Sequence, residues 1–504
     1  MVMEKNFHEG LAGKKNKLKR GLALAVSLIL ALSFAGCGNS QTSKDGESVS
    51  LKYYFPLNAQ DDNDMILGEA NKMVQEKLGA GINFIAVDFA NYSQKMQLIN
   101  ASREVYDLCF TSNWSNDYYQ NVENGNLTVL DELLSEYAPG LMEQVGERYW
   151  DGVRVDGKIY GVINRQIMAR EAGYIVPYAF ADEVDMNLSE ELKTLDGIET
   201  YIKAVQEKHP EAVKVFPLAL SYMNAQGLDF FMGDTFPAAV YRGAEGCPKV
   251  VNPYESQAYK DYLAARKSWV SQGIAPANMV VDNEALNAQF FLNGQLATPI
   301  AMLSTNKPGV EAEMLAQHEV ELKAIPIGGA VIGSSSVLAT MLGIPQTSKN
   351  PETAMKYINL VNTDKELYNL LSFGIEGRNY TKVGENRIEL NKEHSYIAAN
   401  WSIGDVYNSY LIEGQDDDVW EQTEEMNKSA ELSPLFGFVP DTSSLSVQIS
   451  NCTTVVNEFS TALDWGVGDV DAQYNEFVKK LSEAGIGEII TAIQAQIDTW
   501  YQQK

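Results

Sequence analysis

The chain has few cations and few histidines. Its 504 residues include 39 Lys and Arg, 67 Asp and Glu and four His, which gives a formal net charge of −28. Nucleic-acid binding needs basic side chains that neutralise phosphates, so this balance argues against a nucleic-acid partner and against charge-driven binding to an anionic membrane. So few histidines also provide poorly for acid–base or triad chemistry. Histidine-based catalysis is therefore not expected.

Cysteine is equally scarce, and no motif for metal or nucleotide chemistry is complete. The four cysteines lie far apart without CxxC spacing, so neither a zinc site nor a disulfide framework is expected. Residues 328–333 have the glycine spacing of a phosphate loop, but Ser334 stands where the loop needs Lys. His318-Glu319 begins a zinc-protease string whose second His is absent, and there is no GxSxG elbow. We expect no cofactor and no metal, although a carboxylate pair for glycoside hydrolysis stays open in so acidic a chain.

The charge is unevenly distributed along the chain. Residues 1–20 carry a net charge of +4 and residues 21–36 carry none, whereas from Cys37 onward 33 cations face 65 acids, a net charge of −32. A basic head, an apolar run over 21–34 and small residues at 35 and 36 are typical of a secretory signal peptide, predicted here as residues 1–36. The alternative is a transmembrane anchor, but the run is shorter than the about 20 residues that a spanning helix needs.

The cysteine that follows indicates how the protein is held at the membrane. Phe34-Ala35-Gly36-Cys37 resembles a bacterial lipobox, with Phe34 where Leu is usual. In a lipobox the Cys is diacylated and becomes the mature N-terminus, and two acyl chains give stable anchoring. Residues 37–50 are polar and lack apolar periodicity, so they are predicted to form a tether. We therefore expect lipidation at Cys37 and a location at the extracellular face of the cell membrane.

Beyond the tether, strand and helix patterns alternate. Apolar runs at 51–55, 82–87 and 107–111 are separated by helical periodicities at 65–78 and 92–101. This β-α-β-α-β order predicts an α/β domain with a parallel sheet. A second α/β region is predicted from about 153, and the apolar spacing over 474–500 predicts C-terminal helices.

Several blocks of sequence, in order, resemble a known family. They are Tyr92–Met96 (YSQKM), 106–114 (YDLCFTSNW), 156–162 (DGKIYGV), 347–352 (TSKNPE), 360–364 (LVNTD), 373–377 (FGIEG), 435–438 (LFGF), 474–477 (YNEF) and 484–486 (AGI). Together they resemble the extracellular solute-binding proteins, family 1, of sugar-type ABC importers. The chain looks most like the lipoprotein subfamily of Gram-positive bacteria that carries a C-terminal domain of uncharacterised function.

The resemblance implies a fold and a function. The fold would be an α/β, two-lobed, periplasmic-binding-protein-like structure with a hinge of two or three crossings and with C-terminal helices packed on the second lobe. Lobe one would be 51–152 plus 298–343, and lobe two 153–297 plus 344–504. The ligand would lie between the lobes, at the carboxyl ends of strands.

The implied function is that of the substrate-binding lipoprotein of an ABC importer. Such a protein would capture a carbohydrate, expected to be an oligosaccharide, and deliver it to the permease subunits, acting as a monomer. Two alternatives stay open: a surface-displayed glycan-acting enzyme, and a receptor of the same fold for a peptide or another small metabolite, because fold does not fix the ligand.

A sugar site needs aromatic faces for the pyranose C–H groups and fixed polar partners for the hydroxyls. Such residues follow predicted strands, where they face the cleft of this family; the alternatives are a Trp that covers its own lobe and a salt bridge at the hinge. The main candidates are Asn113 and Trp114, Arg165 and Gln166 beside Asn164, Trp401 and Asp405 (the latter where the family commonly has Asn), and Asn58 and Gln60. Weaker candidates are Tyr174, Tyr222, Ser335 and Phe373. Trp150, Trp269, Trp465 and Trp500 are expected in the core.

Overall fold

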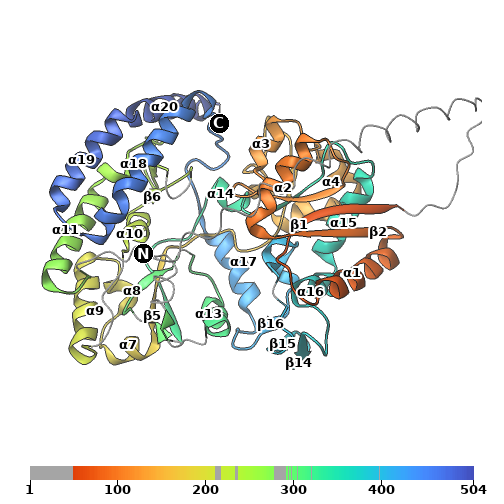
Figure 1. Cartoon of the computed structure of the whole chain (residues 1–504), viewed down its shortest axis with the longest axis horizontal. Helices are drawn as coiled ribbons and strands as arrows, with labels where there is room; N and C mark the ends of the chain where they lie inside the picture. Colours follow the sequence, from red (N-terminus) through yellow and green to blue (C-terminus); the bar gives the residue numbers. More distant parts are fainter. Residues whose placement is uncertain are drawn as a thin grey trace, which may run out of the picture. The chain divides into compact units, whose positions relative to one another are not determined.

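A computed structural model describes residues 49–210, 217–232, 236–276, 291–292, 295–296, 298–303, 305–318, 321–396 and 398–503. All of these belong to one compact unit, Ser48–Lys504, which Figure 1 colours from red at its first strand to blue at its last helix. The predicted signal peptide, Cys37 and nearly all of the predicted tether lie outside the described residues. Within the described part, no helix combines the length and the apolar character that a membrane crossing requires.

The first sheet has the strand order β2-β1-β3-β13-β4. β1 (Ser50–Pro56) pairs in parallel with β2 (Gly81–Val87) and with β3 (Leu108–Thr111). β13 (Met341–Gly343) is antiparallel to β3 and to β4 (Gly161–Ile163). All four residues of β3 are buried, as its continuous apolar run predicts. The predicted β-α-β-α-β order with parallel pairing is confirmed for these first three strands.

Helices cover this sheet and complete a first hydrophobic core. α1 (Asn63–Leu78) buries Ile66, Ala70 and Val74 along one face and ends at Gly79 in the left-handed conformation, φ +67°. Further helices contribute buried side chains to the same core: α2 (Phe89–Ala101), α3 (Tyr118–Glu123), α4 (Asp131–Tyr137), α5 (Pro139–Val145), α6 (Glu147–Trp150), α15 (Pro351–Thr363) and α16 (Lys365–Phe373). Beside them lie β14 (Tyr380–Lys382), β15 (Arg387–Leu390), β16 (Leu411–Ile412), the short helices η2 (Asn400–Ser402) and η3 (Val406–Asn408), and α17 (Val419–Ser429).

A second core forms around β5 (Gly173–Pro177), which lies between the antiparallel strands β10 (Ala301–Leu303) and β11 (Leu322–Pro326). Its helices are α7 (Tyr178–Glu183), α8 (Leu188–Glu191), α9 (Leu195–Lys208), α10 (Ala219–Ala225), α11 (Gln257–Gln272), α18 (Ser446–Trp465), α19 (Val470–Glu483) and α20 (Ile486–Tyr501); α13 (Val310–His318) packs nearby. Ile489, Ile493 and Ile497 of α20 are fully buried in this core. The prediction that the C-terminal helices pack on the second lobe is confirmed (Figure 1).

Strand pairing divides the chain differently from the predicted lobe boundaries. Residues 298–343 were assigned to lobe one, yet β10 and β11 pair with β5 in the second core. Conversely, β4 and the helices α15 and α16, assigned to lobe two, pack on the first sheet. The reason is physical: helical periodicity marks an apolar face but does not say which sheet that face covers. In the structure, Tyr357 of α15 lies against Tyr53 and Phe84, with ring centroids 5.8 and 6.2 Å apart.

Within the described residues, the chain passes between the two cores three times. The first passage follows β4, the second precedes β12 (Val331–Ile332) and the third follows α17 through β17 (Glu431–Leu432). The three passages lie side by side. Arg170 of the first passage forms an antiparallel β-bridge with Val331 of the second, and β12 of the second pairs in parallel with β17 of the third. Asn427 of α17 also holds the first passage: its Oδ1 accepts hydrogen bonds from the backbone N–H groups of Met168 and Ala169, at 2.8 and 2.9 Å.

Candidate functional site

The structure brings Trp114 and Trp401 together. Trp114 lies in the segment that follows β3 and is 53% exposed, while Trp401 lies in η2 and is partly buried. Their ring centroids are 5.9 Å apart. The indole N–H of Trp114 donates to the carbonyl of Ala339 at 2.8 Å, which fixes the ring although it is half open to solvent. Two side chains predicted independently from the sequence therefore form one aromatic surface.

Phe89 extends this surface and was missed by the sequence analysis. Its ring centroid lies 6.0 Å from that of Trp401, and the buried Phe110 contacts both tryptophans at 5.8 and 6.3 Å. We call Phe89, Trp114 and Trp401 the aromatic platform. Phe89 is the first residue of α2 and lies two residues after the end of the parallel strand β2, so the rule that ligands lie at the carboxyl ends of strands could have found it.

Two asparagines near the platform carry acceptor oxygens without a partner in the described structure. The Oδ1 atoms of Asn113 and Asn164 are buried and accept no hydrogen bond there. The backbone N–H of Asn113 donates to Leu338, and the amide of Asn164 reaches the carbonyl of Trp401 at 3.5 Å. A buried acceptor left unpaired costs about 1–3 kcal/mol, so each oxygen is suited to receive a donor from a bound molecule or from water.

Three further candidates lie near these groups. The side-chain amide of Gln166 donates to the Thr340 hydroxyl at 3.2 Å, one residue beyond the carbonyl that holds Trp114. The exposed Asn58 accepts the backbone N–H of Phe89 at 3.1 Å and so flanks the platform. Gln60 lies in the same loop, which Asp62 anchors through a bidentate ion pair with Arg378.

Arg165 and Asp405 are brought together, but as an ion pair. Their Nη1 and Oδ2 atoms are 3.3 Å apart, and Arg165 also reaches Glu424 at 3.4 Å and stacks on Tyr407, 3.8 Å from the ring centroid. Asp405 is 2% exposed and burial raises the pKa of its carboxyl, an effect that Arg165 opposes. Arg165 lines a hollow of about 310 Å³ with residues of α5, α6 and α17. This geometry is that of the salt bridge expected as the alternative to ligand binding at these positions.

The weaker candidates lie elsewhere. Tyr174 is fully buried in β5 between two paired strands, and Tyr222 is 8% exposed in the second core, so neither ring presents a face to a ligand here. The prediction that these two tyrosines contact the ligand is not supported, because their rings pack in the second core. Phe373 packs against the small cluster of Tyr380, Ile388 and Tyr410. Ser335 is partly buried on the short helix α14 (Ser334–Val337).

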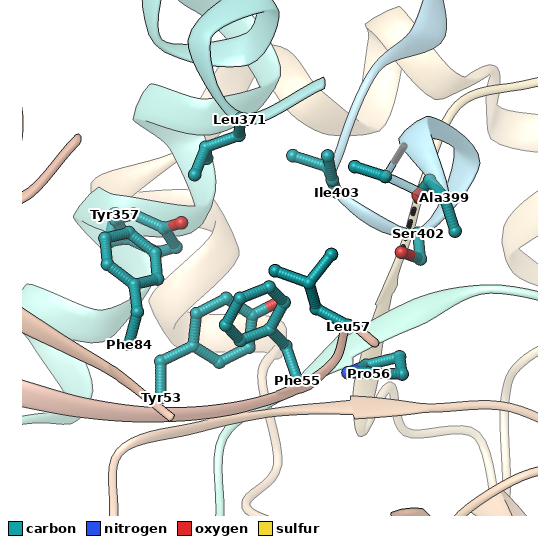
Figure 2. A pocket seen from close by; sticks show the side chains of 11 residues that line it. Tyr53, Phe55, Pro56, Leu57, Phe84, Tyr357, Leu371, Ala399, Ser402 and Ile403 are labelled. Atoms are coloured by element: carbon teal, nitrogen blue, oxygen red, sulfur yellow. Dashed lines mark hydrogen bonds between the residues drawn. The ribbon is translucent and has the colours of Figure 1, made fainter. Parts of the chain in front are cut away.

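A cavity lined by side chains of the first core is too small to be a ligand site. Figure 2 shows Tyr53 and Phe55 of β1, with Leu57 just after the strand, pointing toward Leu371 and Ile403; the Ser402 hydroxyl donates a hydrogen bond to the Ala399 carbonyl. The enclosed space is about 10 Å³. That volume holds no more than one water molecule, and the lining is largely apolar. It is a packing gap of the first core.

Comparisons with known proteins agree with this architecture. Residues 434–502 match a family described as a domain of unknown function, DUF3502. A carbohydrate ABC transporter substrate-binding protein of Streptococcus pneumoniae serotype 4 (strain ATCC BAA-334 / TIGR4) is 26% identical over 97% of this chain and all of its own length.

Solved structures are similar over both cores. An N-glycan transport solute-binding protein of Streptococcus pneumoniae (NgtS) matches with a TM-score of 0.79 at 24% identity, over 90% of this chain and 99% of the other. The same protein in complex with Man5GlcNAc matches with a TM-score of 0.67 at 25% identity, over 91% and 99%. An HMO-binding solute-binding protein of Bifidobacterium longum infantis matches with a TM-score of 0.66 at 15% identity, over 90% and 100%. The chain therefore has the two-lobed fold of the extracellular solute-binding proteins, and its predicted resemblance to the carbohydrate-type members with a C-terminal domain of uncharacterised function is confirmed.

Proposed function

We propose that the protein is the substrate-binding component of an ABC importer and that it captures an oligosaccharide on the aromatic platform. The observation that carries the proposal is the pairing of Trp114 and Trp401 at the carboxyl end of the first sheet, with the indole of Trp114 fixed yet half exposed. The relatives support the ligand class, since one is named for carbohydrate transport and another was solved with Man5GlcNAc.

The platform suits a ligand of more than one sugar ring. Pyranose C–H faces pack on aromatic rings, and three rings in sequence at 5.9 and 6.0 Å offer adjacent stacking positions. Asn58, Asn113, Asn164 and Gln166 supply amide groups at the edges of the platform, as hydroxyl recognition requires. Arg165 and Asp405 form an ion pair with each other, so we assign them to supporting the 400–408 segment that carries Trp401. Direct contact of either residue with the ligand stays a prediction.

The protein is further proposed to bind without catalysis, as a lipid-anchored receptor. A receptor shifts between lobe arrangements as its ligand binds, which needs no acid–base pair. The diacylated Cys37 would hold the acidic body at the extracellular face of the membrane, where it would deliver its ligand to the permease subunits as a monomer. The lipobox-like sequence around Cys37 supports the anchor, and the role of the relative in carbohydrate ABC transport supports delivery to a permease.

Calorimetric titration of the soluble chain (residues 38–504) tests the function. We expect saturable binding of mannose- and N-acetylglucosamine-containing oligosaccharides and no binding of a peptide panel. A reducing-sugar assay on the same glycans separates a receptor from a glycan-acting enzyme, because turnover would contradict the receptor assignment. Binding of peptides in place of sugars would favour the alternative receptor of the same fold.

A further inference from the structure

Residues 435–438, which we call the hinge turn, insert neighbouring side chains into two different cores. Phe436 is 5% exposed and belongs to the first core, whereas Leu435 and Phe438, 2% and 6% exposed, belong to the second. Phe438 packs in the second core against Trp500 of α20, at a ring-centroid distance of 5.5 Å. The turn lies at the start of the segment that matches DUF3502, directly after the third passage between the cores.

The backbone of the hinge turn is tightly specified. The N–H groups of Phe436 and Phe438 donate to the carbonyls of Ser433 and Leu435, both at 2.9 Å. Gly437 adopts φ +84°, and a Cβ atom there would lie 3.3 Å from the carbonyl oxygen of Asp151. Only glycine fits this conformation without strain, so the turn is a defined structural element rather than a loose connection.

The hinge turn holds the short helix α14. The N–H of Gly437 donates to the hydroxyl of Ser334, the first residue of α14, at 2.8 Å. Phe436 and Val337, the last residue of α14, both press on Gly152, where a Cβ atom would lie only 2.8 and 2.5 Å from them. Both ends of α14 are therefore positioned by contacts that the hinge turn makes or shares.

The residues that follow α14 hold the aromatic platform. The carbonyl of Leu338 accepts the backbone N–H of Asn113 at 3.0 Å, and the carbonyl of Ala339 accepts the indole N–H of Trp114 at 2.8 Å. A continuous series of contacts thus runs from the hinge turn through α14 to the indole of Trp114.

We propose that the hinge turn is a positioning element for ligand binding: through α14 it sets the orientation of Trp114, so that the DUF3502 segment of the second lobe controls the platform on the first. The inference rests on the proposed function in that Trp114 is taken to contact the sugar. Neighbouring side chains of the hinge turn belong to different cores, so a displacement of one core relative to the other moves the turn. The contacts of α14 then transmit this movement to Trp114. Phe436, Gly437 and Ser334 are positioning residues that do not touch the ligand.

The decisive experiment needs no ligand. The chain has seven tryptophans, so labelling with 5-fluorotryptophan gives a small set of ¹⁹F resonances, and Trp114→Phe identifies that of Trp114. In the ligand-free protein, Phe436→Leu and the milder Ser334→Ala are expected to shift or broaden the Trp114 resonance, and Ser334→Thr to restore it. The matched control is Phe459→Leu, in the same segment, because Phe459 stacks on Phe477 in the second core with centroids 5.7 Å apart.

The outcomes are distinct. A changed Trp114 resonance in Phe436→Leu and Ser334→Ala, with an unchanged one in Phe459→Leu, supports the positioning role. An unchanged Trp114 resonance in folded Ser334→Ala and Phe436→Leu overturns it. If the unaltered protein binds no sugar, the proposed function fails, but this ligand-free result still decides whether the hinge turn positions Trp114.

A double-mutant cycle on affinity for Man5GlcNAc adds the functional readout. When two residues act through one another, the effects of substituting them do not add, and the binding constant of the double variant typically departs from additivity by about twofold or more. Phe436→Leu is expected to weaken binding about fivefold in the unaltered protein and less than about twofold when Trp114 is already Ala. Equal effects in both backgrounds would show that Phe436 acts independently of Trp114 and would contradict the proposal.

Discussion

The indole rings of Trp114 and Trp401 lie 5.9 Å apart, and the buried ring of Phe110 touches both. One ring follows a strand of the first sheet and the other belongs to a short helix far along the chain. The contact makes a shared surface from two segments that only the tertiary structure brings together. Ligand binding by the protein is proposed to depend on this surface.

Phe89 is expected to matter for long ligands more than for short ones. It extends the platform beyond Trp401, so Phe89→Ala should weaken binding of a pentasaccharide or longer glycan by about three- to tenfold and affect a disaccharide less. Calorimetry with a series of ligand lengths measures this. Tyr501→Ala, which removes a 41% exposed ring on α20, is the control. An equal loss for every ligand length would contradict the placement of Phe89 at the end of the platform.

Asn427 is expected to stabilise the first passage between the cores. Its side chain accepts two backbone N–H groups and donates to the Gln166 carbonyl at 2.7 Å while 4% exposed. Asn427→Ala leaves those buried groups unpaired and should lower the free energy of unfolding by about 2 kcal/mol or more. Denaturant unfolding measures the change, with the exposed Asn124→Ala as control. A loss no larger than that of the control would show that the passage is held by other contacts.

Asp464 is expected to make stability depend on pH. Burial raises the pKa of its carboxyl to about 7, although the Tyr259 hydroxyl donates to it at 2.9 Å and Arg266 opposes the rise. The folded state therefore binds this proton between about pH 4 and pH 7 while the unfolded state does not, so this contribution to stability is lost as pH rises through that window, by up to about 1.4 kcal/mol per pH unit.

Asp464→Asn should accordingly flatten the pH dependence. Unfolding free energies at pH 5 and pH 7.5 are expected to differ less in this variant than in the unaltered protein. Asp471→Asn, at a side chain 72% exposed, is the control and should keep the original slope. If the unfolding free energy of Asp464→Asn depends on pH as steeply as that of the unaltered protein, other titratable groups cause the pH dependence.

Local patterns predicted the early strands and helices well. The apolar run of β3 and the one-sided periodicity of α1 are properties of a few consecutive residues, and the structure confirms both. The assignment of α15 to a lobe could not be predicted in the same way, because Tyr357 needs an apolar partner and the sequence does not say that Tyr53 provides it. The lobe boundaries differ for that reason.

The site was predictable to the extent that it follows strands. Trp114 lies three residues after the last residue of β3, and the same rule points to Phe89, two residues after β2. Neither the contact between Trp114 and Trp401 nor the pairing of Arg165 with Asp405 could be derived, since both join distant segments. The sequence likewise marked residues 435–438 as a block of the resemblance, but only the structure assigns its side chains to two cores.

Calorimetric titration of Man5GlcNAc into the unaltered protein, Trp114→Ala, Trp401→Ala and the Tyr501→Ala control measures whether the aromatic platform binds the sugar. Removing a stacked aromatic ring from a binding surface typically costs about tenfold or more in affinity. We expect such a loss for each tryptophan variant and an unchanged affinity in the control. Unchanged affinity in both Trp114→Ala and Trp401→Ala would contradict the assignment of the aromatic platform as the ligand site.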